Sequence, residues 1–520
     1  MRVLVFHGYL LHGTGSNVYN ASLAQALTAL GHEVHLLCQD REAAGLDWVH
    51  ALGTWEGGGL SVEKRREPHG PGSVTAYVPE IGGLLPVYVA DRYEGFEVKA
   101  FPELSADELD RYLEANVAAV RDVVARAGQP AAALANHLIM GPVILARAGL
   151  EFAIKVHGSD LSYTVRPHPE RFVPFAREGA EAAAGVLVGS LYTAEDLWKT
   201  VDLAGLREKT RLGPPGVDVE SFRQLPPGRA DAAMRRLAER LESIAVQTGA
   251  EDAFARDPAE AARALRWFAD GVRARVLYVG KLLINKGVDL LLAGWPLVAR
   301  EQPGARLLVI GFGAYRSPLQ RLWQALEAGD LQAAREFAAA GRALESDDAD
   351  AAPLPILSGF LSDPPEGYLE AARAAVGSVS FGGRLEHAEV AEVLPAADAF
   401  VMPSTFPEAF GMVAAEAAAC GVLPVSAAHS GMAEVSGRLA EAVPDVAELL
   451  SFPVSGEAVT EISWRLQSWL SLPPPKRREL GAALAERVRE LWSWRSVADG
   501  VIAASRGELD SLPAVPAGGG

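Results

Sequence analysis

Two glutamates stand eight positions apart in the segment from Ser404 to Glu416, and they form the sharpest chemical pattern in the sequence. Glu408 lies in the expected loop after an apolar strand, and Glu416 lies in the helix that follows. Carboxylates accept hydrogen bonds from sugar and ribose hydroxyls, and the start of a helix offers backbone N–H groups to phosphate. The segment therefore predicts a site for a phosphorylated, hydroxyl-rich ligand. The alternative is that Glu408 complements the helix dipole and Glu416 is an ordinary helix residue.

Two lysines, five residues apart, form a second candidate site. Lys281 and Lys286 follow an apolar run, in a loop that opens at Gly280 and precedes a helical pattern. Lysine is a compact cation that can neutralise phosphate charge without a metal. We expect the two ammonium groups to converge on a diphosphate. Taken singly, each lysine is better explained as a surface residue.

Two further loops carry polar residues at the ends of predicted strands. The loop His12–Asn17 contains Gly13 and Gly15, which allow close approach of backbone to a ligand, and Ser16 is expected to cap the next helix. A tight structural turn explains this loop equally well. His157 follows a second strand and is expected to project from the sheet edge, while Asp160 either caps the next helix or contributes to the site.

The elements that must position these residues alternate between buried strands and helices. Continuous apolar strands separated by helices indicate parallel sheets covered on both faces. In the first part of the chain, strands are expected at Val3–Phe6, Glu33–Cys38, Ala132–Asn136, Phe152–Val156 and Val186–Gly189. After Arg275 they are expected at Val276–Val279, Leu307–Ile310, Val379–Phe381, Ala399–Met402 and Leu423–Ser426. The fold class predicted is α/β, with two Rossmann-like doubly wound domains that face each other across a cleft.

The domain boundaries follow from the restart of this pattern. We expect a first domain over residues 1–215, a second domain over 216–490, and a last helix over 491–511. Residues 512–520 are rich in Pro, Ala and Gly and are expected to be disordered. Residues of about 228–270 and 317–356 show helical spacing and are expected to be helical-hairpin insertions, for packing or for a role near the acceptor.

The composition excludes several classes of protein. The 520 residues carry a net charge of −18, which argues against nucleic acid or an anionic membrane as a general partner. The sequence has no apolar run of the roughly 18 residues that a membrane span needs, and no signal peptide is expected. The two cysteines, Cys38 and Cys420, suit a reducing cytoplasm, with peripheral attachment to the inner face of a membrane left open.

Taken together, the motifs resemble those of the GT-B glycosyltransferases of family 4, which retain anomeric configuration. Glu408 to Glu416 resembles the family's E-x7-E segment, and Gly280 to Gly287 resembles its G-R-x4-K-G motif with Lys281 in place of arginine. Further matches are Pro215–Phe222, Ser430–Glu434, the Gly13 loop and His157–Asp160. The resemblance covers most of the chain except the two insertions and the tail. It implies that residues 1–215 bind the acceptor, that residues 216–490 bind the nucleotide-sugar, and that the helix over 491–511 crosses back to the first domain.

The resemblance implies a role for each matching residue. The catalytic group would be His157, Lys281, Lys286 and Glu408, with the lysines on the diphosphate and Glu408 on a donor-sugar hydroxyl. Glu416 would bind the ribose, and Arg384 and Leu385 would read the base. The remaining donor contacts would come from Gly13, Gly15, Ser16, Asn17, Gly280, Phe410, Gly411, Met412 and Val413. Asn17 and Asp160 are the candidates for contact with the acceptor, which is otherwise expected to meet loops in residues 50–110.

The implied reaction moves a sugar from a nucleotide-sugar to a hydroxyl of a small-molecule, saccharide or lipid-linked acceptor. UDP-glucose or UDP-N-acetylglucosamine is the favoured donor, and GDP-mannose is the alternative. No cofactor and no metal are expected, because the lysines neutralise the leaving diphosphate. A homo-oligomer stays open. The alternatives are an epimerase or phosphorylase of the same fold, or a non-catalytic partner protein; a dehydrogenase is disfavoured because the dinucleotide fingerprint is absent.

Overall fold

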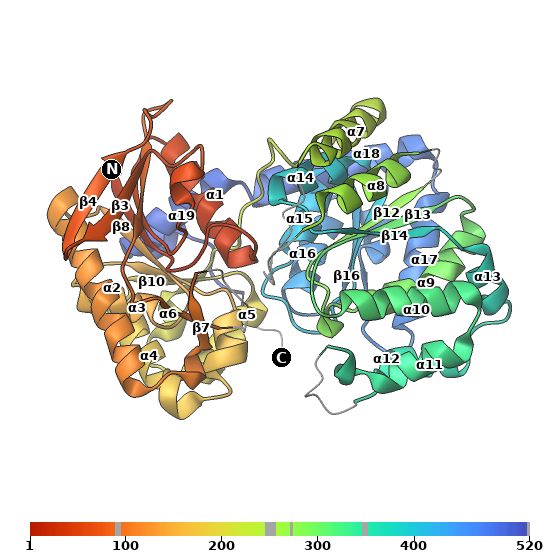
Figure 1. Cartoon of the computed structure of the whole chain (residues 1–520), viewed down its shortest axis with the longest axis horizontal. Coiled ribbons are helices and arrows are strands. Elements are labelled where there is room, and N and C mark those ends of the chain that lie inside the picture. Colours follow the sequence, from red (N-terminus) through yellow and green to blue (C-terminus); the bar gives the residue numbers. More distant parts are fainter. Residues whose placement is uncertain (89–94, 245–255, 271–273, 346–351, 517–520) are drawn as a thin grey trace. The chain divides into compact units, whose positions relative to one another are not determined.

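A computed structural model describes residues 1–88, 95–244, 256–270, 274–345 and 352–516. The chain divides into two compact units (Figure 1). Unit 1 consists of Met1–Gly216 together with Trp492–Gly520, and unit 2 consists of Val217–Leu491. The divisions fall one residue from the boundaries that the sequence predicts. Unit 2 is thus inserted, in the order of the chain, between the body of unit 1 and its last helix.

Unit 1 is built on a sheet whose strands follow the order β11-β10-β9-β8-β1-β2-β5-β3-β4. All neighbours in it pair in parallel except β3 and β4, which form an antiparallel hairpin. A separate parallel pair, β6 with β7, lies within the region expected to meet the acceptor. The strands are β1 (Arg2–Phe6), β2 (Glu33–Leu37), β3 (Ala51–Glu56), β4 (Gly59–Lys64), β5 (Ser73–Val78), β6 (Leu84–Val87), β7 (Glu97–Ala100), β8 (Ala132–Asn136), β9 (Ala153–Lys155), β10 (Gly185–Val188) and β11 (Thr210–Leu212).

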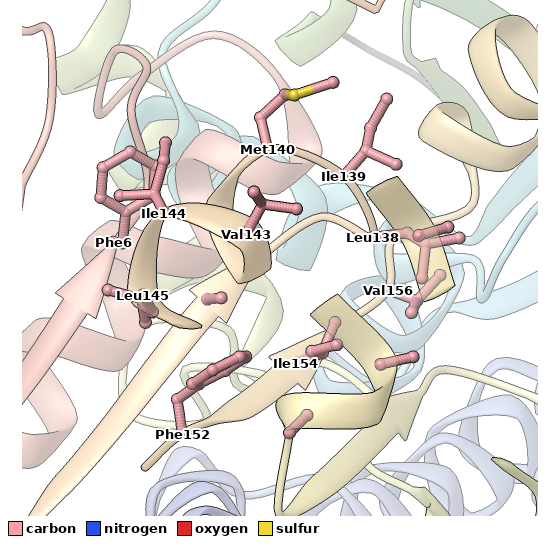
Figure 2. Close-up of a cluster of buried hydrophobic side chains, with 14 of the residues drawn as sticks. Phe6, Leu138, Ile139, Met140, Val143, Ile144, Leu145, Phe152, Ile154 and Val156 are labelled. Carbon is pink, nitrogen blue, oxygen red and sulfur yellow. The ribbon is translucent and has the colours of Figure 1, made fainter. Parts of the chain in front are cut away.

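Helices cover both faces of this sheet, as the uninterrupted apolar strands predict. Along β1, Val3 and Val5 pack with side chains of α1 and α19, while Leu4 and Phe6 pack with α2, α3 and α4. Figure 2 shows part of the second cluster, including Phe6 and Ile144. The helices are α1 (Gly15–Ala29), α2 (Ala106–Ala127), α3 (Gly141–Arg147), α4 (Pro169–Ala182), α5 (Leu191–Val201), α6 (Leu206–Lys209) and α19 (Trp494–Ser505).

Local sequence explains where the helices begin, and it corrects one expectation. The apolar spacing predicts a helix over Asn116–Ala127, but helix α2 already starts at Ala106. It starts there because Ser105 and Glu108 form a reciprocal capping box. The predicted cap at Ser16 is wrong. Helix α1 begins at Gly15 with Thr14 in the cap position, and Thr14 makes no side-chain capping bond. Ser16 is therefore the second residue of the helix.

The end of the chain corrects a second expectation. Helix α19 packs on α1 and on strands β8, β9 and β10, so the last helix belongs to unit 1 as predicted. The prediction that residues 512–520 are disordered is wrong for the part up to Pro516. Leu212 donates its N–H to the Pro513 carbonyl at 2.9 Å, and Ala514 bridges to Arg211 of β11. Residues 517–520 lie outside the described residues.

Unit 2 carries a parallel sheet in the order β14-β13-β12-β15-β16-β17. Its strands are β12 (Arg275–Val279), β13 (Arg306–Ile310), β14 (Val379–Gly383), β15 (Ala399–Met402), β16 (Leu423–Ala427) and β17 (Ser451–Phe452). Its helices are α7 (Pro227–Glu242), α8 (Pro258–Ala269), α9 (Val288–Glu301), α10 (Arg316–Ala328), α11 (Leu331–Ala340), α12 (Pro355–Ser362), α13 (Tyr368–Ala374), α14 (His387–Val393), α15 (Met412–Ala419), α16 (Ser430–Ala440), α17 (Ala458–Ser471) and α18 (Pro474–Leu491).

The two predicted insertions are helical pairs. Helices α7 and α8 pack against each other (Figure 1), and α8 begins with Asp257 accepting a hydrogen bond from the Glu260 N–H at 2.9 Å. Helices α10 and α11 form the second pair, and α12 packs on α11. Residues 245–255 and 346–351, which belong to the predicted insertions, lie outside the described residues. The α/β class with two parallel sheets is confirmed.

Candidate functional site

The first predicted lysine lies where loops after three neighbouring strands of unit 2 meet. The Tyr278 hydroxyl donates to the Lys281 carbonyl at 2.8 Å and so shapes the loop that opens at Gly280. Lys281 Nζ lies 6.0 Å from the centre of the Phe312 ring, and the Arg384 guanidinium carbon lies 5.9 Å from the same ring. Phe312 therefore joins the predicted phosphate loop to the predicted base-reading segment. Phe312 is not among the predicted site residues, because a lone aromatic after a strand usually packs in the core.

The second lysine meets the first of the two glutamates. Lys286 Nζ forms a short ion pair with Glu408 Oε1, and their side chains are 25% and 22% exposed. The backbone supports this contact, since the Thr405 N–H donates to the Asn285 carbonyl at 2.9 Å. Half-buried charges attract each other more strongly than exposed ones because water screens them less. The pair therefore forms a preset cation and anion beside the loop after β15.

The loop after β15 is also tied to the loop after β16. The Glu408 N–H donates to Ser430 Oγ at 2.9 Å, and the Gly431 N–H donates to the Glu408 carbonyl at 2.9 Å. His429 Nε2 lies 2.9 Å from the Ser404 carbonyl. These bonds fix the backbone of Glu408, and the Ser404 hydroxyl lies 2.9 Å from its carboxylate oxygen Oε1. His429 is not among the predicted site residues, because the segment that resembles the family begins one residue later, at Ser430.

The second glutamate is buried and already has a partner. Glu416 is 3% exposed, and its Oε1 lies 2.8 Å from Nε2 of His387 at the start of α14. Burial lowers the pKa of His387, but the charge and hydrogen bond of the Glu416 carboxylate, together with the charge of Asp218, outweigh it, so the net shift is upward. The Phe222 ring packs 4.9 Å from the His387 ring. His387 is thus a functional candidate that is not among the predicted site residues, and its partner Glu416 lies 29 positions away.

The other predicted donor contacts gather around these two carboxylates. Arg384 is 9% exposed and donates to Glu386 at 2.8 Å, and Leu385 is buried beside it. Phe410 is buried, and Gly411 precedes α15 with φ of 115°, a conformation that favours glycine. Met412 and Val413 are the first residues of α15, where N–H groups have no acceptor within the helix. Unit 2 therefore brings cationic, acidic and N–H groups to the ends of its strands.

In unit 1, the glycine loop is anchored by Asp40, an acid that is not among the predicted site residues. Asp40 Oδ2 accepts from the Leu11 N–H at 3.0 Å and lies 3.3 Å from His12 Nδ1. Burial raises the pKa of Asp40, but the bonds from His12 and two backbone N–H groups outweigh it, so the pKa is lowered. An ionised Asp40 therefore holds the loop that contains Gly13, which has φ of 91°.

His157 and Asp160 differ in their surroundings. His157 is partly buried, its Nε2 lies 3.0 Å from Asn136 Oδ1, and burial lowers its pKa well below the usual value. Asp160 is fully buried and accepts from the N–H groups of Leu138, Gly158 and Leu161. Its carboxylate therefore fixes the loops after β8 and β9. Asn17 is buried as well, so the predicted acceptor contacts of Asn17 and Asp160 stay predictions that their burial does not favour.

Metal sites and membrane-spanning helices are both lacking among the described residues. No group of three or more His, Cys, Asp or Glu side chains among them is placed to hold a metal ion. In the same part of the chain, none of the helices combines the length and the apolar character that crossing a bilayer requires.

Comparison with known proteins links this geometry to sugar transfer. Residues 369–486, which include Glu408, Glu416 and His387, match the family model described as "Glycosyl transferases group 1". The D-inositol 3-phosphate glycosyltransferase of Segniliparus rotundus is 29% identical over 311 residues, which are 58% of this chain and 48% of that protein. The GDP-mannose-dependent monoacylated alpha-(1-6)-phosphatidylinositol monomannoside mannosyltransferase of Corynebacterium glutamicum is 30% identical over 220 residues, or 41% and 42% of the two chains. The chain spans about half the length of the curated relatives it matches.

A solved structure decides the fold. Anabaena HepE in complex with UDP and glucose aligns over 98% of this chain and 100% of its own, with a TM-score of 0.53 and 14% identity. The fold is GT-B. The predicted fold class is therefore confirmed, and the group 1 match supports a GT-B glycosyltransferase. The finer assignments, to family 4 and to a retaining reaction, are taken up below.

Proposed function

We propose that this GT-B protein is a retaining hexosyltransferase of family 4 that moves a sugar from a nucleotide-sugar to an acceptor hydroxyl. One observation carries the proposal: unit 2 brings Lys286, Glu408 and Glu416 together with the start of α15 at the ends of its strands. These are the group types that a nucleoside diphosphate sugar requires. Two carboxylates accept from hydroxyls, and a cation with helix N–H groups attracts phosphate.

The Lys286–Glu408 ion pair suggests how the donor is received. In the protein alone, each charge satisfies the other. A donor offers both groups better-matched partners, since its diphosphate attracts the Lys286 ammonium and a sugar hydroxyl donates to the Glu408 carboxylate. Both contacts then hold the sugar beside its leaving group. Glu408 stays oriented throughout, because its backbone N–H and carbonyl are fixed by Ser430 and Gly431.

Catalysis in this scheme rests on the charge that develops as the sugar leaves. The bond from the anomeric carbon to the diphosphate oxygen breaks, and negative charge grows on the diphosphate. Lys281, Lys286 and the start of α15 stabilise that charge more in the transition state than in the ground state. We therefore propose a reaction that needs no metal and no cofactor. The acceptor hydroxyl oxygen attacks the anomeric carbon from the face of the departing diphosphate and passes its proton to a diphosphate oxygen. Configuration is thereby retained, and no protein nucleophile is assigned.

The donor and the acceptor are proposed more broadly. UDP-glucose or UDP-N-acetylglucosamine remains the favoured donor, and the UDP and glucose bound by HepE support it. The GDP-mannose dependence of the Corynebacterium relative supports the alternative. An acceptor that carries a phosphorylated polyol, alone or on a lipid, is compatible with the names of both curated relatives. Contacts of His157 and the Gly13 loop with the donor, and a cytoplasmic location, stay predictions.

Thermal stabilisation by nucleotides tests the proposal. UDP, GDP, ADP and their sugar conjugates are added separately, with and without EDTA. A nucleotide at 100 times its Kd adds about 2.7 kcal/mol of stability, which shifts the melting temperature visibly. We expect a shift with one nucleotide that EDTA does not change. A shift that EDTA abolishes would refute metal independence, and the absence of any shift would refute the donor site. Product analysis by NMR then reports whether the anomeric configuration is retained.

A further inference from the structure

A continuous chain of buried polar side chains runs beneath the glycine loop of unit 1. It joins five side chains from three adjacent strand ends and the first turns of α1: Asn17, His7, Asn20, Asn136 and His157. The first four are at most 2% exposed. Strands β1, β8 and β9 lie next to one another in the sheet, so His7, Asn136 and His157 emerge at the same edge. Buried amides and imidazoles need partners, and here they supply one another.

Backbone carbonyls fix the direction of every bond near the glycine loop. A carbonyl oxygen can only accept, so the Asn17 amide atom that lies 2.6 Å from the His12 carbonyl is Nδ2. Asn17 therefore presents Oδ1 to His7 Nε2 at 3.1 Å, and the same nitrogen lies 2.8 Å from the Leu10 carbonyl. Facing two acceptors, His7 Nε2 must carry its proton.

The direction continues through Asn20. Burial lowers the pKa of His7 to about 3, so the ring is neutral and its Nδ1 has no proton. Nδ1 must then accept, and Asn20 Nδ2 donates to it across 3.0 Å. The same amide nitrogen lies 2.7 Å from the Ser16 carbonyl, which independently identifies it as the donor. Asn20 therefore turns its Oδ1 towards Asn136.

The last two bonds settle the state of His157. Asn136 Nδ2 donates to Asn20 Oδ1 and lies 3.5 Å from the Phe6 carbonyl, so Asn136 presents Oδ1 to His157. That oxygen lies 3.0 Å from His157 Nε2, which must donate. Burial keeps His157 neutral, as do the nearby His137, Lys155 and His7. The lone pair of His157 is thereby placed on Nδ1.

We propose that Asn20 and Asn136 are positioning residues that hold His157 as its Nε2–H tautomer, so that His157 meets a ligand only as a hydrogen-bond acceptor through Nδ1. A sugar hydroxyl suits such an acceptor, and a carbonyl or phosphate oxygen does not. The part that concerns the donor rests on the proposed function. The part that concerns the tautomer does not, because it follows from contacts within unit 1.

NMR of the full-length protein with ¹⁵N-labelled histidine tests the tautomers without any ligand. We expect His7 and His157 to be neutral with the proton on Nε2 between pH 6 and 8, with His7→Gln and His157→Gln used to assign the signals. A His157 signal with the proton on Nδ1, or a charged ring at pH 7, would overturn the proposal. The wild-type spectrum is decisive even where a variant does not fold.

Asn136→Ala tests whether the hydrogen bonds of Asn20 and Asn136 set the tautomer of His157. It removes the acceptor of His157 Nε2–H, so a mixture of tautomers is expected. Asn116→Ala is the matched control. Asn116 is equally buried, but it donates to the Tyr112 carbonyl at 2.8 Å and does not belong to the series of hydrogen bonds that ends at His157. An unchanged His157 signal in Asn136→Ala, or the same change in both variants, would contradict the positioning role.

Turnover provides the functional readout. The release of nucleoside diphosphate from UDP-glucose or GDP-mannose is expected to fall roughly 10- to 100-fold in Asn136→Ala, with little change in KM, because misplaced groups mainly affect the transition state. Asn116→Ala should release it at the wild-type rate. Equal rates in the two variants would refute the link to the donor. If wild type releases nothing, the proposed function fails while the tautomer result stands.

Discussion

Glu416→Gln separates the charge of the buried carboxylate from its size. The substitution keeps the side-chain volume, so it opens no cavity, and the amide oxygen can still accept from His387 Nε2. It removes the negative charge from a residue that is 3% exposed. A hydrogen bond to a charged group contributes about 1.5–3 kcal/mol. If the Glu416 carboxylate binds the ribose, nucleotide affinity should fall by about 2–3 kcal/mol, or roughly 30- to 150-fold in Kd.

Isothermal titration calorimetry with the nucleotide that stabilises the wild type measures this loss. Glu479→Gln is the control, since Glu479 is an exposed glutamate whose ion pair, within the described part of the chain, is with Lys476. Circular dichroism confirms that each variant is folded. A folded Glu416→Gln variant that binds within twofold of wild type would refute the ribose assignment. The control should bind like the wild type.

Three further predictions concern groups of unit 2. Lys286→Ala should slow nucleotide release about 10²- to 10³-fold, because a group aimed at developing charge lowers the barrier by about 2.7–4 kcal/mol; a rate within threefold of wild type would contradict its role. The ion pair of His387 with Glu416 raises the pKa of His387, so its stabilisation is present in full below pH 6.5 and is lost as the pH rises through the raised pKa. Urea unfolding should thus show a larger difference between wild type and His387→Gln at pH 6 than at pH 9, and equal differences would refute the pair. In Gly287→Ala, the added Cβ would lie 2.0 Å from a backbone carbonyl oxygen at φ of 65°, so we expect a loss of about 2 kcal/mol or more. Gly304→Ala, at φ of 84° with no atom within 4 Å, should lose only about 1 kcal/mol in the same measurement.

Local patterns explain which parts of the fold were predictable. Strands such as β1 and β12 are uninterrupted apolar runs, so their burial on both faces follows from sequence. The antiparallel hairpin of β3 and β4 is absent from the predicted strands, because burial alternates only weakly along both strands. The early start of α2 could have been predicted, since Ser105 and Glu108 have capping-box spacing.

The candidate site was predictable where residues close in sequence act together. Glu408 and Glu416 stand on one loop and the helix that follows it, so their spacing carries the information. The partner of Glu416 is His387, which lies 29 positions away, and this contact depends on how α14 meets α15. The bonds of Asn136 to Asn20 and His157 cross 116 and 21 positions. A single sequence does not show such pairings, because only the tertiary fold brings the strand ends together.

The position of α19 has a consequence for biosynthesis. Ala498 and Val501 belong to the core that α1 and β1 begin, yet a ribosome makes them only after all of unit 2. The part of that sheet face that α19 covers, beside α1, therefore stays exposed while some 275 residues are added, a count that runs from Val217 to Leu491. Unit 2 has no such gap and can fold as soon as it emerges. The nascent chain thus exposes an apolar surface on unit 1 until translation is nearly finished, which makes it a substrate for chaperones that bind such surfaces.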